Sequence, residues 1–447
     1  MPSNLKNRLQ LIRKARTEIK SERKSENKGI DTDAVKATQL NAGLFGADWT
    51  AAGYQVARRY AKLPLPFGIP AVFPDSFAVI VRDFVKYGSV PLPCDLVFFD
   101  LETTGLSGGA GTLAFLASFG RFEKTNIINI TQYLLLDYPG EGDFIELCRK
   151  ELSAPGISGS GAVIVSYNGK TFDSQIFKNR CLMNATVPPE YFHADLLHPS
   201  RRLWKNVLEN CSQGTIETEI IGLDRTGDTP GALAPDIWFS FLKTGETGEL
   251  TGICDHNIRD ISGLASICLL LANIAIDPLK VLDTHKYDLE SLALLWRDAI
   301  LKPNKFSSSG KKFSAKIDTT GRISTINTIN TIGQKTTEIL LEAAVERSLP
   351  KAVFVYGMDL LKTENADRGR TLLLKLAGGA IPDVTSKLRL AAFRSLAIDA
   401  EWKLRNIPAA VSYSESALAL CETDDISILK TEIENRRERL TKKITVN

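Results

Sequence analysis

The alternation of apolar and polar positions is clearest between residues 94 and 183, where it predicts a mixed α/β arrangement. Three apolar segments separated by short turns with Gly or Asn predict strands, at residues 95–101, 111–120 and 127–136. Connections this short favour an antiparallel meander. A helix is expected at 141–152, a buried strand at 163–167 and a second helix at 172–183. This order predicts a mixed sheet flanked by helices.

The remaining segments are predicted to be largely helical. Helices are expected near 50–62 and 75–87, around a Pro-rich stretch, and then at 194–208, 256–274 and, as a pair, 278–302. Residues 303–335 have the Ser, Gly, Lys, Thr and Asn content of a linker. From residue 336, paired segments resemble tetratricopeptide repeats, at 336–347 with 350–363 and at 385–405 with 408–421. A charged terminal helix is expected at 424–444.

These patterns divide the chain into four parts. We expect a basic helical and irregular extension at 1–93, an α/β domain at 94–302, a linker at 303–335 and a helical-repeat domain at 336–447. The chain has 447 residues, of which 44% are hydrophobic and 24% charged, so it is long enough to form several globular domains.

Positive charge is concentrated at the N-terminus. The formal net charge is only +3, yet residues 1–28 hold nine Lys or Arg against three Glu, a local balance of +6. A solvated helix face and an electrostatic arm for phosphate backbones both explain this balance. Seven cysteines without a C-x-x-C pair indicate free thiols in a reducing compartment. Because no apolar run reaches 18 residues and no signal-peptide pattern is present, we expect a cytoplasmic protein without a membrane partner.

The candidate chemistry begins where the first predicted strand ends. Asp100 and Glu102 follow an apolar run, and alternation along a strand turns both side chains to one face. Two carboxylates on one face repel each other unless a cation lies between them, and Mg²⁺ prefers such oxygen ligands. Two solvated acids at a strand end are the alternative interpretation.

Further acids occur at the ends of other apolar elements. Asp173 begins a predicted helix after an Asn-Gly turn, where Asn168 and Lys170 could contact a phosphate, although an acid at a helix start also stabilises the helix dipole. His256 and Asp260 are four residues apart, so they share one helix face, about 6 Å apart at Cβ. Such a pair suits general acid–base chemistry, with a surface ion pair as the alternative. Jointly, the three segments predict a metal site.

Three segments resemble the exonuclease motifs of the DEDD superfamily, whose fold is ribonuclease H-like. They are 99–105 (FDLETTG), 167–173 (YNGKTFD) and 256–260 (HNIRD). The neighbouring segments 193–197 (HADLL), 201–205 (RRLWK) and 228–231 (DTPG) look most like the YprB-type branch. The resemblance covers about residues 94–275. One departure is that the third motif has three residues between His and Asp, as in the tyrosine-type motif, where the histidine type has four.

The resemblance implies an α/β, ribonuclease H-like mixed sheet followed by an all-α helical-repeat region. It also implies a metal-dependent nuclease. Asp100, Glu102, Asp173 and Asp260 would bind two Mg²⁺ or Mn²⁺ ions, and His256 would be the general base. The expected activity is hydrolysis of phosphodiester bonds as a 3′–5′ exonuclease on single-stranded nucleic acid, by a two-metal mechanism.

Several alternatives stay open from the sequence. Lys170, Arg201, Arg202 and Lys205, with Asn168, are candidates for binding the nucleic-acid backbone, or a solvated helix face. DNA and RNA are both possible substrates. The chain could instead be a non-cutting nucleic-acid-binding scaffold that recruits a protein partner through its helical repeats. A zinc hydrolase would need clusters of His or Cys that the sequence lacks.

Overall fold

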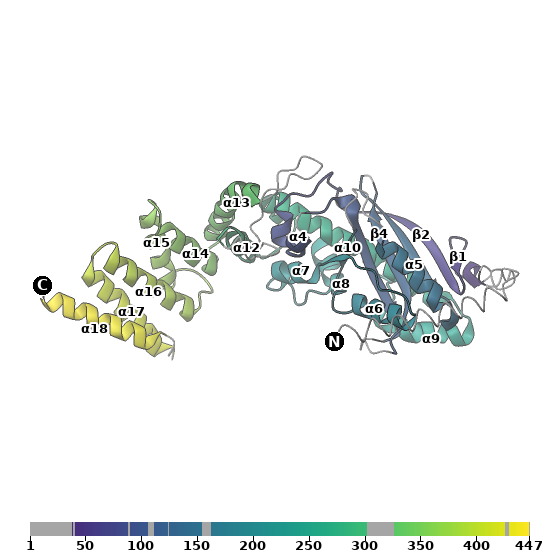
Figure 1. The fold of residues 1–447 in the computed structure, drawn as a ribbon. Helices are drawn as coiled ribbons and strands as arrows, with labels where there is room; N and C mark the ends of the chain where they lie inside the picture. Colours follow the sequence, from purple (N-terminus) through teal and green to yellow (C-terminus); the bar gives the residue numbers. More distant parts are fainter. Residues whose placement is uncertain are drawn as a thin grey trace, which may run out of the picture. The chain divides into compact units, whose positions relative to one another are not determined.

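The computed structural model describes most of the chain as two compact units (Figure 1). The described residues are 38, 41–87, 90–105, 111–123, 125–153, 162–301, 326–424 and 429–446. Among the described residues, the first unit ends at Tyr287 and the second begins at Asp288. The predicted basic arm at 1–28 and most of the predicted linker lie outside the described residues.

The first unit is built on a seven-stranded mixed sheet in the order β1-β2-β5-β4-β3-β6-β7. Its strands are β1 (Thr50–Gly53), β2 (Val56–Pro64), β3 (Leu96–Thr103), β4 (Ala114–Phe122), β5 (Ile127–Leu135), β6 (Val163–Ser166) and β7 (Phe192–Asp195). β3, β4 and β5 form an antiparallel meander, whereas β6 is parallel to β3 and β7 is parallel to β6. The predicted mixed sheet and its meander are therefore confirmed.

Two sequence predictions about this sheet are wrong. The helix expected near 50–62 is the β1–β2 hairpin, and all nine residues of β2 pair with β5. Arg59 is buried there, so the strand lacks the alternation of apolar and polar side chains that would have revealed it. The helix expected at 194–208 is strand β7 followed by α7 (Leu197–Trp204), because residues 192–195 pair with β6.

Helices pack on both faces of the sheet. They are α3 (Phe77–Ile80), α4 (Asp83–Tyr87), α5 (Glu141–Ser153), α6 (Asp173–Met183), α7, α8 (Gln213–Ile216), α9 (Ala234–Thr244), α10 (Gly248–Ile276) and α11 (Pro278–Leu282). The 3₁₀ turns are η1 (Pro93–Asp95), η2 (Tyr138–Gly140) and η4 (Gly231–Leu233), and η3 (Glu217–Ile221) is a π-helical turn. The single helix expected near 75–87 is thus divided into α3 and α4.

The longest of these helices, α10, has 29 residues and packs on β3, β4 and β5 (Figure 1). Its length and a mean hydropathy of 1.5 would suit a membrane span, but 78% of that stretch is buried inside the protein. The apolar composition is therefore explained by contact with the sheet. The opposite face carries an aromatic core in which Phe99 of β3 lies 5.3 Å from Phe119 and 6.4 Å from Phe177 of α6, between ring centroids.

The second unit is entirely helical in its described residues. Its helices are α12 (Leu289–Leu301), α13 (Ile326–Glu346), α14 (Pro350–Leu360), α15 (Ala366–Ala377), α16 (Ser386–Trp402), α17 (Ile407–Thr423) and α18 (Lys430–Val446). Each packs on the next along the chain. The predicted helical region is confirmed, while its likeness to tetratricopeptide repeats stays a prediction.

The boundary between the units differs from the predicted one. The second unit begins at Asp288, since α12 packs against α13, whereas we expected the α/β domain to extend to 302. α13 begins at Ile326, inside the segment predicted as linker, and Ile326, Ile329 and Ile332 recur there at the helical spacing of three. All seven cysteines are free thiols, as predicted.

Candidate metal centre

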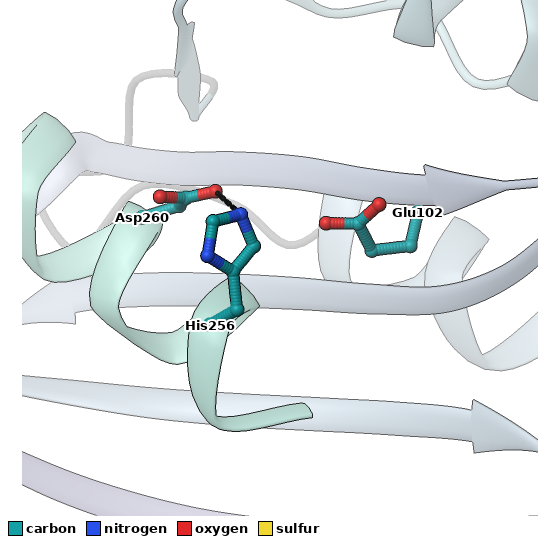
Figure 2. Close-up of side chains that lie close together, drawn as sticks. All are labelled: Glu102, His256 and Asp260. Atoms are coloured by element: carbon teal, nitrogen blue, oxygen red, sulfur yellow. Dashed lines mark ion pairs between the residues drawn. The ribbon is translucent and has the colours of Figure 1, made fainter. Parts of the chain in front are cut away.

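The end of strand β3 and one face of helix α10 bring acidic side chains together (Figure 2). Glu102, from the strand, faces His256 and Asp260, from the helix. One ligand atom from each of these three residues lies within 4.8 Å of the other two. His256 Nε2 is 3.2 Å from Asp260 Oδ2, which is the i, i+4 contact expected from the sequence.

Asp100 and Asp173 are not among the three residues within 4.8 Å of one another, but their charges act on the same site. Burial raises the pKa of Asp100 well above its ordinary value, and the charges of Asp173, Asp260 and Glu102 raise it further. Burial likewise raises the pKa of Glu102, with contributions from Asp260 and Asp173. Four carboxylates that the sequence separates by up to 160 residues therefore share one electrostatic environment.

Asp173 is held at the start of α6 by the turn that precedes it. Its side chain is buried, and burial followed by the charge of Asp195 raises its pKa to about 7. A Cβ atom at Gly169 would lie 2.7 Å from Asp173 Oδ2, so only glycine fits beside this carboxylate. Asp195 accepts hydrogen bonds from the backbone N–H of Asn168 at 2.8 Å and of Lys170 at 3.2 Å, which fixes the turn.

His193 braces the same turn from strand β7. Its two ring nitrogens hydrogen bond to Ser166 Oγ at 2.7 Å and to Ser174 Oγ at 2.9 Å. Burial, and then the positive charge of Lys170, lowers the pKa of His193 to about 4. The imidazole is therefore neutral near pH 7 and links the end of β6 to the first turn of α6, next to Asp173.

His256 is oriented by a residue that sequence reasoning did not assign. Asp228 Oδ2 lies 2.9 Å from His256 Nδ1 and 2.6 Å from Arg225 Nη1. Although burial acts to raise it, hydrogen bonds from Arg225 and His256 hold the pKa of Asp228 below its ordinary value. With Nδ1 facing this carboxylate, Nε2 faces Asp260 and the other acids, the orientation that a general base requires.

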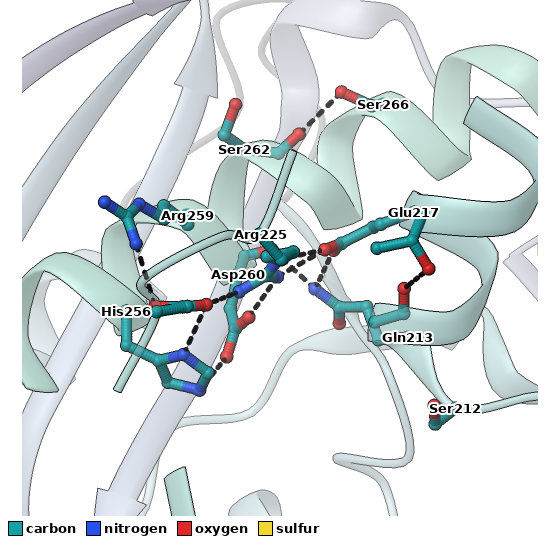
Figure 3. Close-up of polar contacts among 12 residues, drawn as sticks. Ser212, Gln213, Glu217, Arg225, His256, Arg259, Asp260, Ser262 and Ser266 are labelled. Carbon is teal, nitrogen blue, oxygen red and sulfur yellow. Dashed lines mark hydrogen bonds and ion pairs between the residues drawn. The ribbon is translucent and has the colours of Figure 1, made fainter. Parts of the chain in front are cut away.

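Arg225 connects the segment that contains Asp228 to helix α10 (Figure 3). Its Nη2 contacts Asp260 Oδ1 at 2.5 Å, and its Nε donates to Glu217 Oε2 at 2.7 Å. Burial acts to lower the pKa of Arg225, but the charges of Asp260 and Glu217 outweigh it, and the pKa is raised. Glu217 is fully buried, and a Cβ at Gly263 would lie 1.7 Å from its Oε1, so α10 needs glycine at that position.

A pocket of about 450 Å³ lies beside His256 and Asp260. Polar residues line it: Gln213, Gly214, Thr215, Thr218, Arg225, Asp228, His256 and Asp260. Gln213 Nε2 donates to the backbone oxygen of Asp260 at 2.7 Å and to Glu217 Oε1 at 2.8 Å, which fixes one wall (Figure 3). The pocket therefore borders the site at His256 and Asp260.

Two of the predicted phosphate-binding cations are engaged within the protein. Lys170 Nζ pairs with Asp83 Oδ2 at 2.6 Å, and Arg202 Nη1 donates to the backbone oxygen of Ile80 at 3.0 Å. Burial, followed by the charge of Arg82, lowers the pKa of Arg202 to about 10. Both side chains therefore hold α3 and α4 against the domain.

The other three predicted nucleic-acid contacts are exposed. Arg201 and Lys205 lie at the surface near the C-terminal end of α7. Asn168 is exposed in the turn after β6, with a φ of 65°. These three remain available to a ligand, and their role in binding stays a prediction.

The donor set fits hard divalent cations. Glu102 and Asp260 supply oxygen ligands of the kind that Mg²⁺ and Mn²⁺ prefer, with the imidazole of His256 beside them. The buried carboxylates of Asp100 and Asp173, whose charges act on the same site, are of the same kind. Buried like charges raise one another's pKa, and bound cations would reverse that effect. Asp100, Glu102, Asp173 and Asp260 are the candidate ligands, and their role in metal binding stays a prediction.

Known proteins resemble the part of the chain that contains this site. The sequence profile of the RNase_H superfamily matches residues 97–272, so this segment is similar to RNase_H superfamily domains. The uncharacterized protein YprB of Bacillus subtilis (strain 168) is 41% identical over 176 residues, which are 39% of this chain and 41% of that protein. The chain thus matches about two fifths of the length of this curated relative. The family suggests nuclease-type activity.

Proposed function

We propose that this chain is a metal-dependent phosphodiesterase that acts on nucleic acid, as a 3′–5′ exonuclease on single strands. The proposal is supported by the group of Glu102, Asp260 and an oriented His256, on which the charges of Asp100 and Asp173 act, within the segment that matches the RNase_H superfamily profile. Carboxylates that repel one another at a buried site have no structural use, which favours an enzyme over a non-cutting scaffold.

In this mechanism His256 is the general base. Its Nε2 accepts a proton from the attacking water, while its Nδ1–H donates to Asp228, which stabilises the imidazolium that forms. Arg225 holds Asp228 in place and contacts Asp260. Two divalent cations at the four acids would supply positive charge to the scissile phosphate and lower the pKa of the attacking water.

The bond changes follow from this arrangement. The water oxygen forms a bond to phosphorus, the bond from phosphorus to the leaving 3′ oxygen breaks, and that oxygen takes a proton from solvent. The products are a 5′-mononucleotide and a strand shortened by one residue. His256 then returns its proton to solvent, and the protein regains its initial state.

The pocket beside the acids supports action at a strand end. Its volume of about 450 Å³ lies in the range that holds one small ligand, and its walls carry amide and hydroxyl groups. A terminal nucleotide could occupy it while the preceding phosphate reaches the carboxylates. Arg201 and Lys205 are exposed candidates for holding the strand that follows.

A labelled-strand assay tests the proposal. DNA and RNA strands of matched sequence, single and double, carry a label at the 5′ end and are incubated with Mg²⁺ or Mn²⁺. Single strands should shorten one nucleotide at a time, and Asp100→Asn should abolish the reaction. Glu123→Gln is the matched control, because Glu123 is a surface acid paired with Lys62 at 3.0 Å, and it should leave the rate unchanged. Equal cleavage by Asp100→Asn and wild type would refute the assignment.

A further inference from the structure

A row of polar side chains crosses the face of the sheet that α10 covers. Residues paired directly across four neighbouring strands supply it: Asp100 on β3, Ser118 on β4, Gln132 on β5 and Arg59 on β2. Ser118 and Gln132 are fully buried, and Arg59 is 7% exposed. Asn257 of α10, also fully buried, completes the row from above. Buried polar groups of this kind are costly unless every one is hydrogen-bonded.

The hydrogen bonds of this row run in one direction. A guanidinium only donates, so Arg59 Nε donates to Gln132 Oε1, at 2.9 Å. The amide nitrogen of Gln132 must then face the other way. It lies 3.0 Å from Asn257 Oδ1, from Ser118 Oγ and from the backbone oxygen of Cys254.

Asn257 extends this donor-to-acceptor order of hydrogen bonds to Asp100. Asn257 Oδ1 accepts from Gln132 and from the hydroxyl of Ser118, so its amide nitrogen faces Asp100. Asn257 Nδ2 donates to Asp100 Oδ2 at 2.6 Å. One oxygen of this carboxylate is therefore fixed by a protein donor, which sets the direction of the other.

Arg59, at the end of the row away from Asp100, is also held by contacts within the protein. Arg59 Nη2 pairs with Asp255 Oδ1 at 2.8 Å, and Asp255 immediately precedes His256 on α10. The guanidinium also lies 5.0 Å from the ring centroid of Trp49. Arg59 thus contacts both the polar row and the helix that carries the candidate base.

We propose that Arg59, Gln132 and Asn257 form a directional hydrogen-bond relay that positions Asp100 for metal binding. The relay makes the β1–β2 hairpin, which lies outside the matched segment 97–272, part of the metal centre. All three are positioning residues, because only Asp100 among these side chains would contact a cation. The inference rests on the proposed metal site.

Metal affinity in the full-length chain tests the relay directly. Gln132→Glu keeps the shape and accepts from Arg59, which holds it ionised, but it cannot donate to Asn257. Mn²⁺ binding, measured by titration calorimetry, should weaken roughly 10–100-fold, as is typical when a partner of a metal ligand is removed. Coulomb attraction alone predicts tighter Mn²⁺ binding by this variant, since the substitution adds a negative charge near the site.

Matched variants separate the relay from core packing. Ser118→Ala removes a hydroxyl from the same row but leaves Gln132, Asn257 and Asp100 connected, so its Mn²⁺ affinity should stay within about twofold of wild type. Arg59→Met should weaken binding, while Arg59→Lys, which still donates, should largely restore it. The Arg59 pair also decides the matter if Gln132→Glu does not fold, as thermal unfolding would show.

The outcomes distinguish this inference from the proposed function. If wild type binds Mn²⁺ and both Gln132→Glu and Arg59→Met bind it equally well, the relay is wrong and the metal site stands. If wild type binds no Mn²⁺, the metal centre and the relay fall together. Weakened binding in those two variants, with Ser118→Ala unchanged, supports the relay.

Discussion

Strand β3 presents faces of opposite character to the two sides of the sheet. Toward α6 it turns Phe99, which is packed among aromatic rings. Toward α10 it turns Asp100, at the end of a row of buried polar groups. The first face contributes stability through apolar burial, whereas the second keeps polar groups in place for chemistry and contributes less. Neighbouring residues should therefore respond to substitution in opposite ways.

The largest contrast is expected between Asp100→Asn and Phe99→Ala. Asp100→Asn should abolish cleavage yet leave the free energy of unfolding equal or higher, because it removes a buried charge among like charges. Phe99→Ala should lower the free energy of unfolding by about 3–5 kcal/mol through a core cavity. Urea titrations, with cleavage assayed on the folded fraction, measure both. A stability loss in Asp100→Asn comparable to that in Phe99→Ala would contradict the comparison.

A smaller effect is expected at the candidate base. His256→Ala should slow cleavage roughly 10²–10⁴-fold at neutral pH, which is the usual contribution of a general base. Asp228→Asn should slow it less, since the imidazole remains but loses its charged partner. His285→Ala, which removes a histidine packed on Phe67 elsewhere in the unit, is the control. Single-turnover rates at saturating Mg²⁺ give the comparison, and a wild-type rate in His256→Ala would assign the base to another group.

The polar face should also make stability depend on pH. The folded pKa values of Asp100, Glu102 and Asp173 are raised, that of Asp173 from an ordinary 3.8 to about 7. The folded state then holds more protons than the unfolded state between about pH 4 and 7, so stability falls as pH rises through that window. Each group contributes at most about 1.4 kcal/mol per pH unit.

Metal removal sharpens this pH prediction. Unfolding temperatures in EDTA should decrease from pH 5 to pH 7.5. Added Mg²⁺ should reverse most of the decrease, because its positive charge offsets the repulsion among the ionised acids. Asp173→Asn should flatten the profile in EDTA. A profile that instead rises over this range would show that the carboxylates are stabilised as anions without metal.

The smallest effects are expected at the exposed rim of the unit. Arg201→Ala and Lys205→Ala should change the free energy of unfolding by less than about 0.5 kcal/mol, as surface substitutions usually do. Each should raise KM for single strands and lower the slope of log affinity against log salt by about one unit if it contacts a phosphate. Affinities measured from low to moderate salt test this, and unchanged slopes would place the strand elsewhere.

The acids could be named as candidates from the sequence because each interrupts or borders an apolar run. Asp100 directly follows the apolar run 96–99 of its strand, Asp173 opens a helix, and Asp260 follows His256 by one helical turn, so their positions along single elements were enough. The mixed sheet was predictable for the same reason. The alternation of apolar and polar residues within one element can be recognised from neighbouring positions alone. It is clear in the three strands of the meander and in the strand that follows them.

The supporting residues could not be predicted in this way. Ser118 and Gln132 interrupt apolar strands, and only the cross-strand register shows that they are adjacent. Strand β2 could not be recognised in the sequence, since the buried Arg59 breaks the alternation of apolar and polar side chains. Asp228 acts through a contact with His256, 28 residues away. Such partners follow from tertiary contacts, which no single segment of the sequence contains.

The position of α10 along the chain has a consequence for biosynthesis. This helix follows all seven strands in the sequence, so a ribosome releases the complete set of strands before the helix that covers one of their faces. Until residues 248–276 have left the ribosome, α10 cannot cover Gln132 and Asp100, and His256 and Asp260 cannot reach Glu102. In a chain whose α10 is still inside the ribosome the proposed cation site is therefore incomplete, and it can bind a metal as proposed only after the whole domain has been translated.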